Sequence, residues 1–252
     1  MDDLDEGLQQ LRDNDASRTS LLLLCENVDD DDAVALADAL RGNTHLTELD
    51  LSMNGGVGAK GAAALAAALR ENNTLTLLAL GGDSVGDAGA TSLAEALRSN
   101  TALTALDVCG NGISATGARA LAQALSAAAA PALQSLTLTG NSIGDAGAVA
   151  LGQWLSARAA PLTKLRLGMC SVGDAGAAEL AKALARPDSA LELLDLRANA
   201  IGDAGAVALA DVLAKHREMR ECHLHGNAVG KAGVAALKVA HGANKTITTF
   251  QF

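Results

Sequence analysis

Aromatic residues are nearly absent from this chain. Its 252 residues include one tryptophan, two phenylalanines and no tyrosine, although 49% of the residues are hydrophobic. The hydrophobic core must therefore be built from leucine and alanine. Side chains of this size suit the close stacking of similar units.

Long hydrophobic runs are also missing. No apolar stretch approaches the ~18 residues that a membrane-spanning helix needs. The N-terminus, which begins Met1-Asp-Asp-Leu4, lacks a basic segment followed by an apolar one, so no secretory signal is expected. The formal net charge of −10 argues against nucleic acid and membrane as partners, because an acidic surface repels phosphate.

The chain has few residues arranged for chemistry. Its four cysteines stand at unrelated spacings, which favours reduced thiols in a cytosolic or nuclear compartment, and we predict a cytoplasmic protein. We find no paired carboxylates, no nucleophile elbow and no metal-ligand cluster. We therefore expect neither enzyme activity nor a cofactor.

What the chain has in abundance is repetition. From position 18 onward it repeats a unit of 28 to 30 residues, whose first half reads L-x-x-L-x-L-x-x-N in the clearest copies. A fixed period of this length with this opening is the signature of a leucine-rich-repeat solenoid. The copies begin at Arg18, Leu46, Leu75, Leu103, Leu133, Leu162, Leu191, Met219 and Ile247.

Each copy predicts one strand and one helix. The leading half alternates apolar and polar residues, as in Leu136 and Leu138, and the second half has apolar residues at helical spacing. Because helices are wider than the separation of parallel strands, stacking the units bends the body. The predicted fold is a curved α/β horseshoe with parallel strands on its concave face and helices on its convex face.

The register also divides the chain. Residues 1–17 precede the first copy, and Leu4, Leu8 and Leu11 recur there at the spacing of an amphipathic capping helix. Residues 18–246 hold eight repeats, and residues 247–252 begin a ninth strand with no cap. Exposed strand edges invite pairing, so Phe250 and Phe252 should meet a second copy or belong to a longer natural chain.

Two polar positions of the repeat are interpreted as structural. The asparagine after the strand should bond main-chain groups of adjoining turns, as at Asn111 and Asn141, with Cys170 and Asp83 replacing it in two copies. The aspartate of Gly-Asp-Ala-Gly stands where a helix N-cap belongs and should accept hydrogen bonds from the first turn. This aspartate is present at Asp87, Asp145, Asp174 and Asp203.

These repeats resemble the ribonuclease-inhibitor subtype of leucine-rich repeat over residues 18–252. That subtype is shared by ribonuclease inhibitors, NOD-like receptors and Ran GTPase-activating proteins. The phrases Asn43-Thr44, Asn73-Thr74 and Asn100-Thr101 are most similar to the NOD-like receptor repeats. The resemblance implies a protein that binds other proteins, mostly through the concave face and its rims.

Strand alternation places a set of charged side chains on the concave face. The earlier strands contribute acidic residues, and the later strands contribute a basic group, which we expect to meet an acidic surface of a partner protein. The alternative is a lateral ladder, Arg166–Asp195–His223, that satisfies itself between strands. The candidate partner-binding residues are Asp50, Asp107, Lys164, Arg166, Asp195, Arg197, His223 and His225.

Four further features have alternative interpretations. His223 and His225 share one strand face, but two ligands do not make a metal site, and we favour surface histidines. Gly56-Val-Gly58-Ala-Lys60-Gly61 matches a dinucleotide-binding motif by letters, but the repeat itself explains its glycines. The run Asp29–Asp32 lacks the spacing of a calcium loop and fits the start of a helix. Trp154 either fills a gap between helices or forms an exposed anchor on the convex side.

The sequence thus predicts a non-catalytic scaffold that binds a partner protein through its concave face. An alternative is a regulator of an enzyme in trans, such as a GTPase activator.

Overall fold

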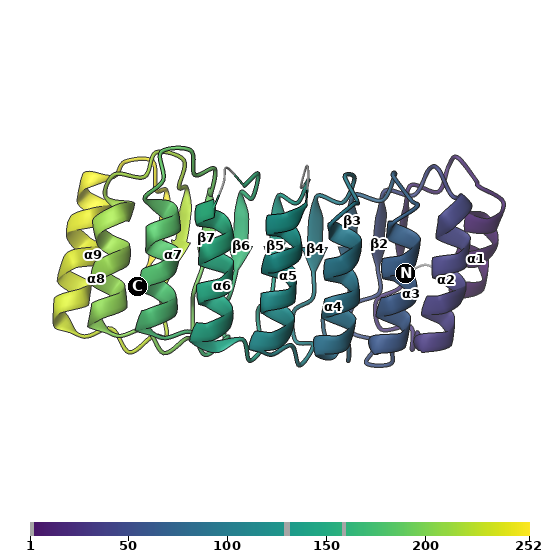
Figure 1. Cartoon of the computed structure of the whole chain (residues 1–252), viewed down its shortest axis with the longest axis horizontal. Helices are drawn as coiled ribbons and strands as arrows, with labels where there is room; N and C mark the ends of the chain where they lie inside the picture. Colours follow the sequence, from purple (N-terminus) through teal and green to yellow (C-terminus); the bar gives the residue numbers. More distant parts are fainter. Residues whose placement is uncertain (1–2, 129–131, 158–159) are drawn as a thin grey trace.

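The computed structural model describes residues 3–128, 132–157 and 160–252. Across these residues nine helices alternate with nine short strands in a single row (Figure 1). The helices are α1 (Leu4–Arg12), α2 (Asp30–Gly42), α3 (Ala59–Leu69), α4 (Gly86–Leu97), α5 (Ala115–Ala127), α6 (Gly144–Ala157), α7 (Asp174–Leu184), α8 (Asp203–Leu213) and α9 (Lys231–Ala243). The strands are β1 (Ser20–Leu22), β2 (Glu48–Asp50), β3 (Leu77–Ala79), β4 (Ala105–Asp107), β5 (Ser135–Thr137), β6 (Lys164–Arg166), β7 (Leu193–Asp195), β8 (Glu221–His223) and β9 (Thr249–Gln251).

The strands form one parallel sheet in chain order, and the helices form a layer over one of its faces (Figure 1). This arrangement confirms the predicted α/β solenoid. The pairing register is the same from repeat to repeat, so Leu49, Leu78 and Leu106 lie side by side. We call the face of the sheet opposite the helices the concave face.

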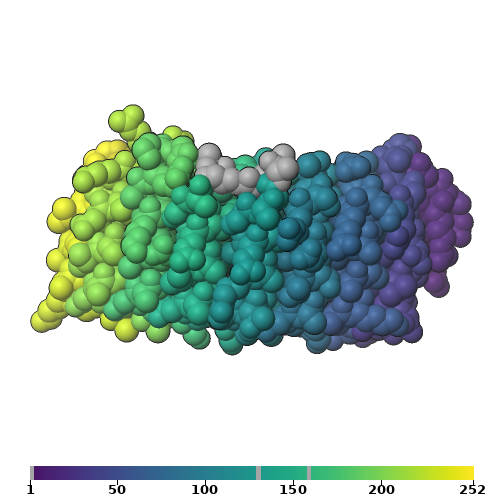
Figure 2. Space-filling view, in the orientation of Figure 1, coloured from purple at the N-terminus to yellow at the C-terminus, as the bar shows by residue number. Residues whose placement is uncertain are grey.

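The core runs unbroken along the solenoid, because every strand turns the same leucine positions toward the helices. Leu136 and Leu138 are fully buried, as are Leu49 and Leu51 in an earlier repeat. Alanines on the inner faces of the helices let neighbouring helices approach closely. Figure 2 shows the resulting elongated body, with the two ends of the chain at opposite ends of the row.

The two ends of the row differ. At the first end, α1 packs Leu8 and Leu11 into the core, beginning at an N-cap, Asp3, whose side chain accepts from Glu6 N. At the other end, β9 pairs with β8 and forms the edge of the sheet. Phe250 packs against the core there, while Phe252 is partly exposed. Within the described part of the chain, no helix is both long and apolar enough to cross a membrane.

Candidate functional site

A ladder of asparagines follows the strands and fixes the edge of the concave face. In Asn141, Nδ2 donates to the carbonyl oxygens of Val108 and Leu138, and Oδ1 accepts from the main-chain N–H groups of Asn111 and Ile113. The predicted structural role of this asparagine is therefore confirmed. The extra residue of the second copy is accommodated without loss of the contact, since Asn54 Nδ2 donates to Leu23 O and Leu51 O.

Asp83 is one of the residues that stand in place of asparagine in this ladder. Its Oδ1 accepts from Gly55 N at 2.7 Å, but its buried Oδ2 has no hydrogen-bond partner. In the asparagine repeats the corresponding amide nitrogen donates to carbonyl oxygens, which a carboxylate cannot do. Burial, opposed by hydrogen bonds from the main chain, raises the pKa of Asp83 to about 6.

The aspartates of Gly-Asp-Ala-Gly cap a different helix from the one predicted. Asp145 is in the first turn of α6, but its Oδ1 accepts from Gly173 N at 2.7 Å and Gly176 N at 2.9 Å, at the start of α7. Each carboxylate therefore satisfies exposed amides of the following repeat rather than of its own helix. The same contact is made by Asp30, Asp87, Asp174 and Asp203.

Two helices lack this cap because alanine stands in the capping position of the preceding repeat. Ala59 precedes α4 and Ala115 precedes α6, and both helices begin with a glycine in the left-handed region, Gly86 at φ 59° and Gly144 at φ 57°. The main chain there donates instead to carbonyls of the next repeat, from Gly86 N to Asn111 O and from Gly144 N to Cys170 O. The residue at the start of one helix thus decides the backbone conformation at the start of the following helix.

The same aspartates explain the two motifs that invited other functions. The amides of Gly58 and Gly61, which a phosphate would need, donate to the Asp30 carboxylate. In the run Asp29–Asp32, Asp29 and Asp32 form a capping box at the start of α2, and Asp31 pairs with Lys60. These carboxylates are used within the fold, in agreement with the structural interpretation.

Among the described residues, the basic part of the concave face does not form the lateral ladder. Arg166 lies beside Asp195 in the strand register, but the Asp195 carboxylate pairs with Arg197 of its own strand, 3.3 Å from Nε to Oδ2. Lys164 is exposed and Arg166 is half-buried, and no ion pair of either occurs within the described part of the chain. Two cationic side chains on alternate positions of β6 are thus left available to a partner.

Acidic side chains of the concave face are fixed by a shared local contact. Asp50 Oδ1 accepts from Ser52 N, and Asp107 Oδ1 accepts from Cys109 N, both at 2.9 Å. Burial, reinforced by the nearby Asp107 carboxylate, raises the pKa of the Cys109 thiol to about 11. Cys109 is therefore a poor nucleophile at neutral pH.

The sequence profile described as "Leucine Rich repeat" matches residues 42–66, 99–122, 130–152, 159–181 and 190–210. These segments fall in register with the strand–helix units of the sheet. The protein is a leucine-rich-repeat protein.

Two solved structures are similar to this chain at low sequence identity. One, "Leiomodin-1 Actin-Binding Site 2 (ABS2)", is 19% identical, with 66% of this chain and 79% of that chain covered and a TM-score of 0.43. The other, the tropomodulin C-terminal domain of Caenorhabditis elegans, is 10% identical, with 66% and 83% covered and a TM-score of 0.44. No curated protein matches the sequence significantly.

His223 and His225 of this leucine-rich-repeat protein lie in the last full repeat. His223 Nδ1 lies 3.0 Å from Gln251 Oε1, and His223 Nε2 lies 3.5 Å from Glu221 Oε2. The His225 ring stands edge-on to His223 with centroids 6.3 Å apart. Across the described ranges, no group of three His, Cys, Asp or Glu side chains is placed to hold a metal ion.

Trp154 requires a correction. Its side chain is only 1% exposed, so the interpretation of Trp154 as an exposed convex anchor is not supported. The ring is buried in the helical layer, where neighbouring repeats carry a small residue. Its position follows from packing, because a large ring gains more from burial between helices than from exposure.

A second set of asparagines, at the C-terminal ends of the helices, was not identified from the sequence. Asn72 Nδ2 donates to Leu40 O and Asn43 O of the preceding repeat, and Asn72 Oδ1 accepts from Leu75 N. Equivalent contacts are made by Asn43, Asn100 and Asn244. The available signal was the recurrence of asparagine three residues before the copies that begin at Leu46, Leu75, Leu103 and Ile247.

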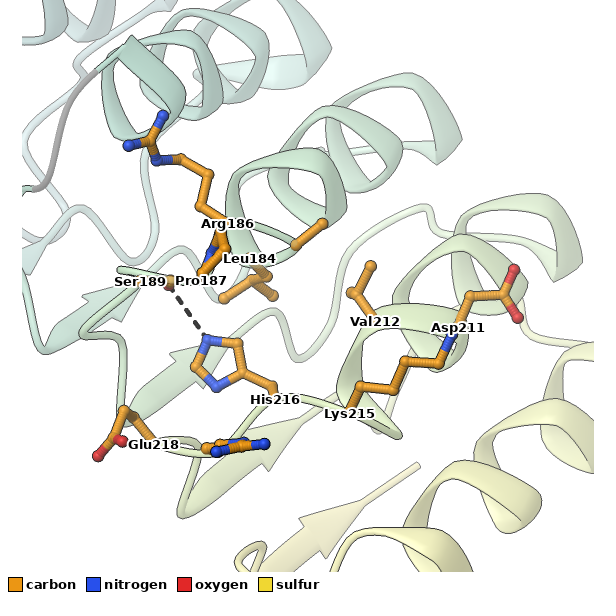
Figure 3. Close-up of a pocket in the computed structure, with 11 residues that line it drawn as sticks. Leu184, Arg186, Pro187, Ser189, Asp211, Val212, Lys215, His216 and Glu218 are labelled. Atoms are coloured by element: carbon orange, nitrogen blue, oxygen red, sulfur yellow. Dashed lines mark hydrogen bonds between the residues drawn. The ribbon is translucent and has the colours of Figure 1, made fainter.

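His216 occupies this second asparagine position after α8. Its Nδ1 accepts from Met219 N, and its Nε2 lies 3.1 Å from Ser189 Oγ, as Figure 3 shows. A surface hollow of about 660 Å³ opens beside it, between the C-terminal ends of α7 and α8 (Figure 3). Leu184, Pro187 and Val212 line the hollow together with side chains of both charges, so it shows no preference for a ligand of one sign.

Proposed function

We propose that this leucine-rich-repeat protein is a non-catalytic scaffold that binds a partner protein through its concave face. The observation that carries the proposal is the pair Lys164 and Arg166 on β6, two cations that no carboxylate of the described residues neutralises. The sheet holds the two backbone positions at fixed spacing, so only the side chains need to order against a partner. Asp195 at the end of β7 and Arg197 just after it extend the surface, and His223 at the end of β8 and His225 just after it border it.

The partner surface that fits these residues is acidic. Lys164, Arg166 and Arg197 form a local basic region on a protein whose formal net charge is −10. Such a region attracts a carboxylate-rich surface and repels a basic one, which favours a correct orientation during association. Asp50 and Asp107 lie on the earlier strands β2 and β4, and the neutral strand β5 separates them from the basic region. Their opposite charge would fix the direction in which the partner lies along the solenoid.

The proposal is tested by reversing charge on β6. Lys164→Glu/Arg166→Glu is compared with Arg98→Glu/Arg119→Glu, which makes the same change in net charge on the helical side. We expect wild type and the helical variant to capture a common protein from lysate, and the β6 variant to lose it. The interaction is then measured with the purified partner. Equal capture by both variants would exclude the concave basic region as the binding site.

A role as regulator of an enzyme in trans is the alternative. It is distinguished by the rate of phosphate release from any captured GTPase loaded with GTP. An activator raises that rate, whereas a plain scaffold leaves it unchanged.

The proposed location is the cytoplasm, which the free state of Cys25, Cys109, Cys170 and Cys222 supports.

A further proposed contact is a homodimer through the edge of β9. There Phe250 and Phe252 stack edge to face with ring centroids 4.8 Å apart, beside an unpaired strand edge.

A further inference from the structure

An apolar surface lies on the concave face at the opposite end from the basic residues. It consists of Leu22, Leu24, Cys25 and Met53, and we call it the N-terminal patch. Leu22 is 36% exposed and Met53 is 63% exposed, and Cys25 is exposed as well. The patch spans β1, β2 and the turns that follow them, on adjacent strands of the sheet. Large apolar side chains gathered in this way on a surface mark an interaction site more often than isolated ones do.

Met53 is directed from the edge of this patch toward the turn that follows β3. A Cβ added at Gly82 of the next repeat would lie 2.6 Å from Met53 Sδ, so the thioether rests against that glycine. The flexible, polarisable side chain of methionine adapts to the shape of an apolar partner. Met53 thus covers part of the turn after β3 and can be displaced or repacked when another chain docks there.

Folding gives no reason for methionine at this position. Met53 has φ 65°, in the left-handed region, where four repeats have glycine (Gly82, Gly110, Gly140 and Gly226) and three others have Cys25, Met169 and Ala198. A side chain at such a position costs about 1–2 kcal/mol, and an exposed thioether returns little of that through burial. At position 53 the protein therefore has an exposed apolar side chain where glycine would be more stable.

The part of the sequence that contains Leu22, Leu24 and Cys25 is rich in acidic residues. Residues 1–32 contain eleven Asp and Glu residues and two Arg residues, which gives −9 of the formal net charge of −10. Nearest to the patch are Glu48 and Asp50, whose strand positions pair with Ser20 and Leu22. Neither carboxylate forms an ion pair among the described residues. An apolar surface with this rim complements a chain that combines apolar and basic side chains.

We propose that the N-terminal patch binds a cationic amphipathic segment of a partner protein, with apolar side chains against Leu22 and Met53 and lysine or arginine beside Glu48 and Asp50. The inference rests on the proposed scaffold function and adds a second contact of opposite charge to the β6 region. A partner that used both would carry a basic segment and an acidic surface, oriented along the solenoid by the two charge signs.

The test uses a random 16-residue peptide library displayed on phage and selected on the purified full chain. We expect enriched peptides to combine Lys or Arg with Leu, Ile, Met or Phe. A synthetic copy of an enriched peptide should bind wild type in fluorescence anisotropy, and Met53→Gly and Glu48→Lys should each weaken binding about tenfold. Binding should also weaken as salt concentration rises.

The matched control is Met169→Gly. Met169 has φ 53°, is 54% exposed and stands at the equivalent position of the sixth repeat, beside the basic residues. This variant should leave peptide binding unchanged. Both glycine variants should keep or raise the melting temperature, so that a loss of binding by Met53→Gly alone is not explained by unfolding.

Three results would overturn the proposal. The first is that no peptide is enriched, or only acidic peptides are. The second is an equal loss of peptide binding in both glycine variants. The third is salt-sensitive self-association of the protein that Met53→Gly abolishes, because a second copy would then be the occupant of the patch. The proposed scaffold function is judged separately. Capture that depends on Lys164 and Arg166 would support it even where the N-terminal patch binds nothing.

Discussion

Asp174 Oδ1 accepts a hydrogen bond from Gly202 N at 2.7 Å, so the first residue of α7 caps the start of α8. The same oxygen accepts from Gly205 N at 2.8 Å. A capping carboxylate usually serves its own helix, whereas here each repeat is capped by the preceding one. The contact therefore contributes to the interface between repeats, which is where a solenoid has its cooperativity.

We expect Asp174→Ala to lower the free energy of unfolding by about 0.5–2 kcal/mol, the usual cost of losing a helix cap. The physical reason is that two amides at the start of α8 lose their acceptor. Urea denaturation followed by circular dichroism measures the change. Asp211→Ala, which removes an exposed aspartate from the last turn of α8, is the control, and an equal effect of the two changes would argue against the inter-repeat cap.

The uncapped helices predict a double-mutant cycle. Gly144→Ala should cost about 1–2 kcal/mol, because Gly144 has φ 57° and an added Cβ meets no neighbour that could compensate. Introducing Ala115→Asp supplies the missing carboxylate and should let the start of α6 adopt the extended conformation seen at Gly173. The cost of Gly144→Ala should then fall by at least about 0.5 kcal/mol. Simple additivity of the two changes would contradict the coupling.

Asp83 predicts a loss of stability as pH rises. Its pKa is about 6 in the folded protein and near its ordinary value of 3.8 in the unfolded chain, so the folded state binds the proton more tightly. Stability is then greatest below pH 3.8 for this group alone and declines as pH rises through about 6. Asp83→Asn should remove that decline and stabilise the protein at pH 7 by about 1–3 kcal/mol, since the amide can donate where Oδ2 has no partner.

The measurement is the difference in melting temperature between Asp83→Asn and wild type across pH 4 to 8. The difference should grow toward neutral pH and level off above about pH 7. A constant difference would show that Asp83 does not titrate in this range.

His216 predicts the opposite dependence. Burial lowers its pKa, which the nearby Glu218 partly offsets, so the folded protein favours the neutral ring. This contribution to stability is complete above pH 6.5 and is lost as pH falls through the folded pKa. His216→Asn should remove the loss, because an asparagine there can repeat the contacts of Asn72. Chemical denaturation at pH 5 and pH 8 tests this, and a variant less stable than wild type at pH 5 would refute it.

The edge of β9 predicts association that increases with salt. Phe252 is partly exposed at this edge, but Lys231, Lys238 and Lys245 of α9 and the following turn would approach their counterparts in a second copy. Added salt screens that repulsion over a Debye length of about 8–10 Å at 0.1–0.15 M. Light scattering at high protein concentration should show a dimer in high salt that Phe252→Glu abolishes. A strictly monomeric protein in both salts would exclude the contact.

Much of this protein could be predicted from the sequence because its dominant signal is local. The alternation around Leu136 and Leu138 is enough to assign a strand with one buried face, and the period assigns the stacking. The asparagine after the strand could likewise be interpreted as structural, since its short polar side chain recurs at one place in the repeat. These inferences need no knowledge of which atoms meet across repeats.

The partner of each side chain needed the structure. The sequence shows that Asp174 stands at a helix start, but only the stacking decides that its carboxylate reaches Gly202, 28 residues later, before the amides of its own helix. The same holds for Asp195, whose charge pairs with Arg197 rather than with Arg166 on the neighbouring strand.

The sequence by itself determined the repeat, the strand and helix halves, the inward leucines and the charged residues available to the concave face. The tertiary structure alone decided the burial of Trp154, the unpartnered oxygen of Asp83, the hollow at His216 and the exposure of Met53. The reason is that periodicity is encoded within one unit, whereas burial and hydrogen bonding depend on the residue that the adjacent unit places about 5 Å away across the sheet.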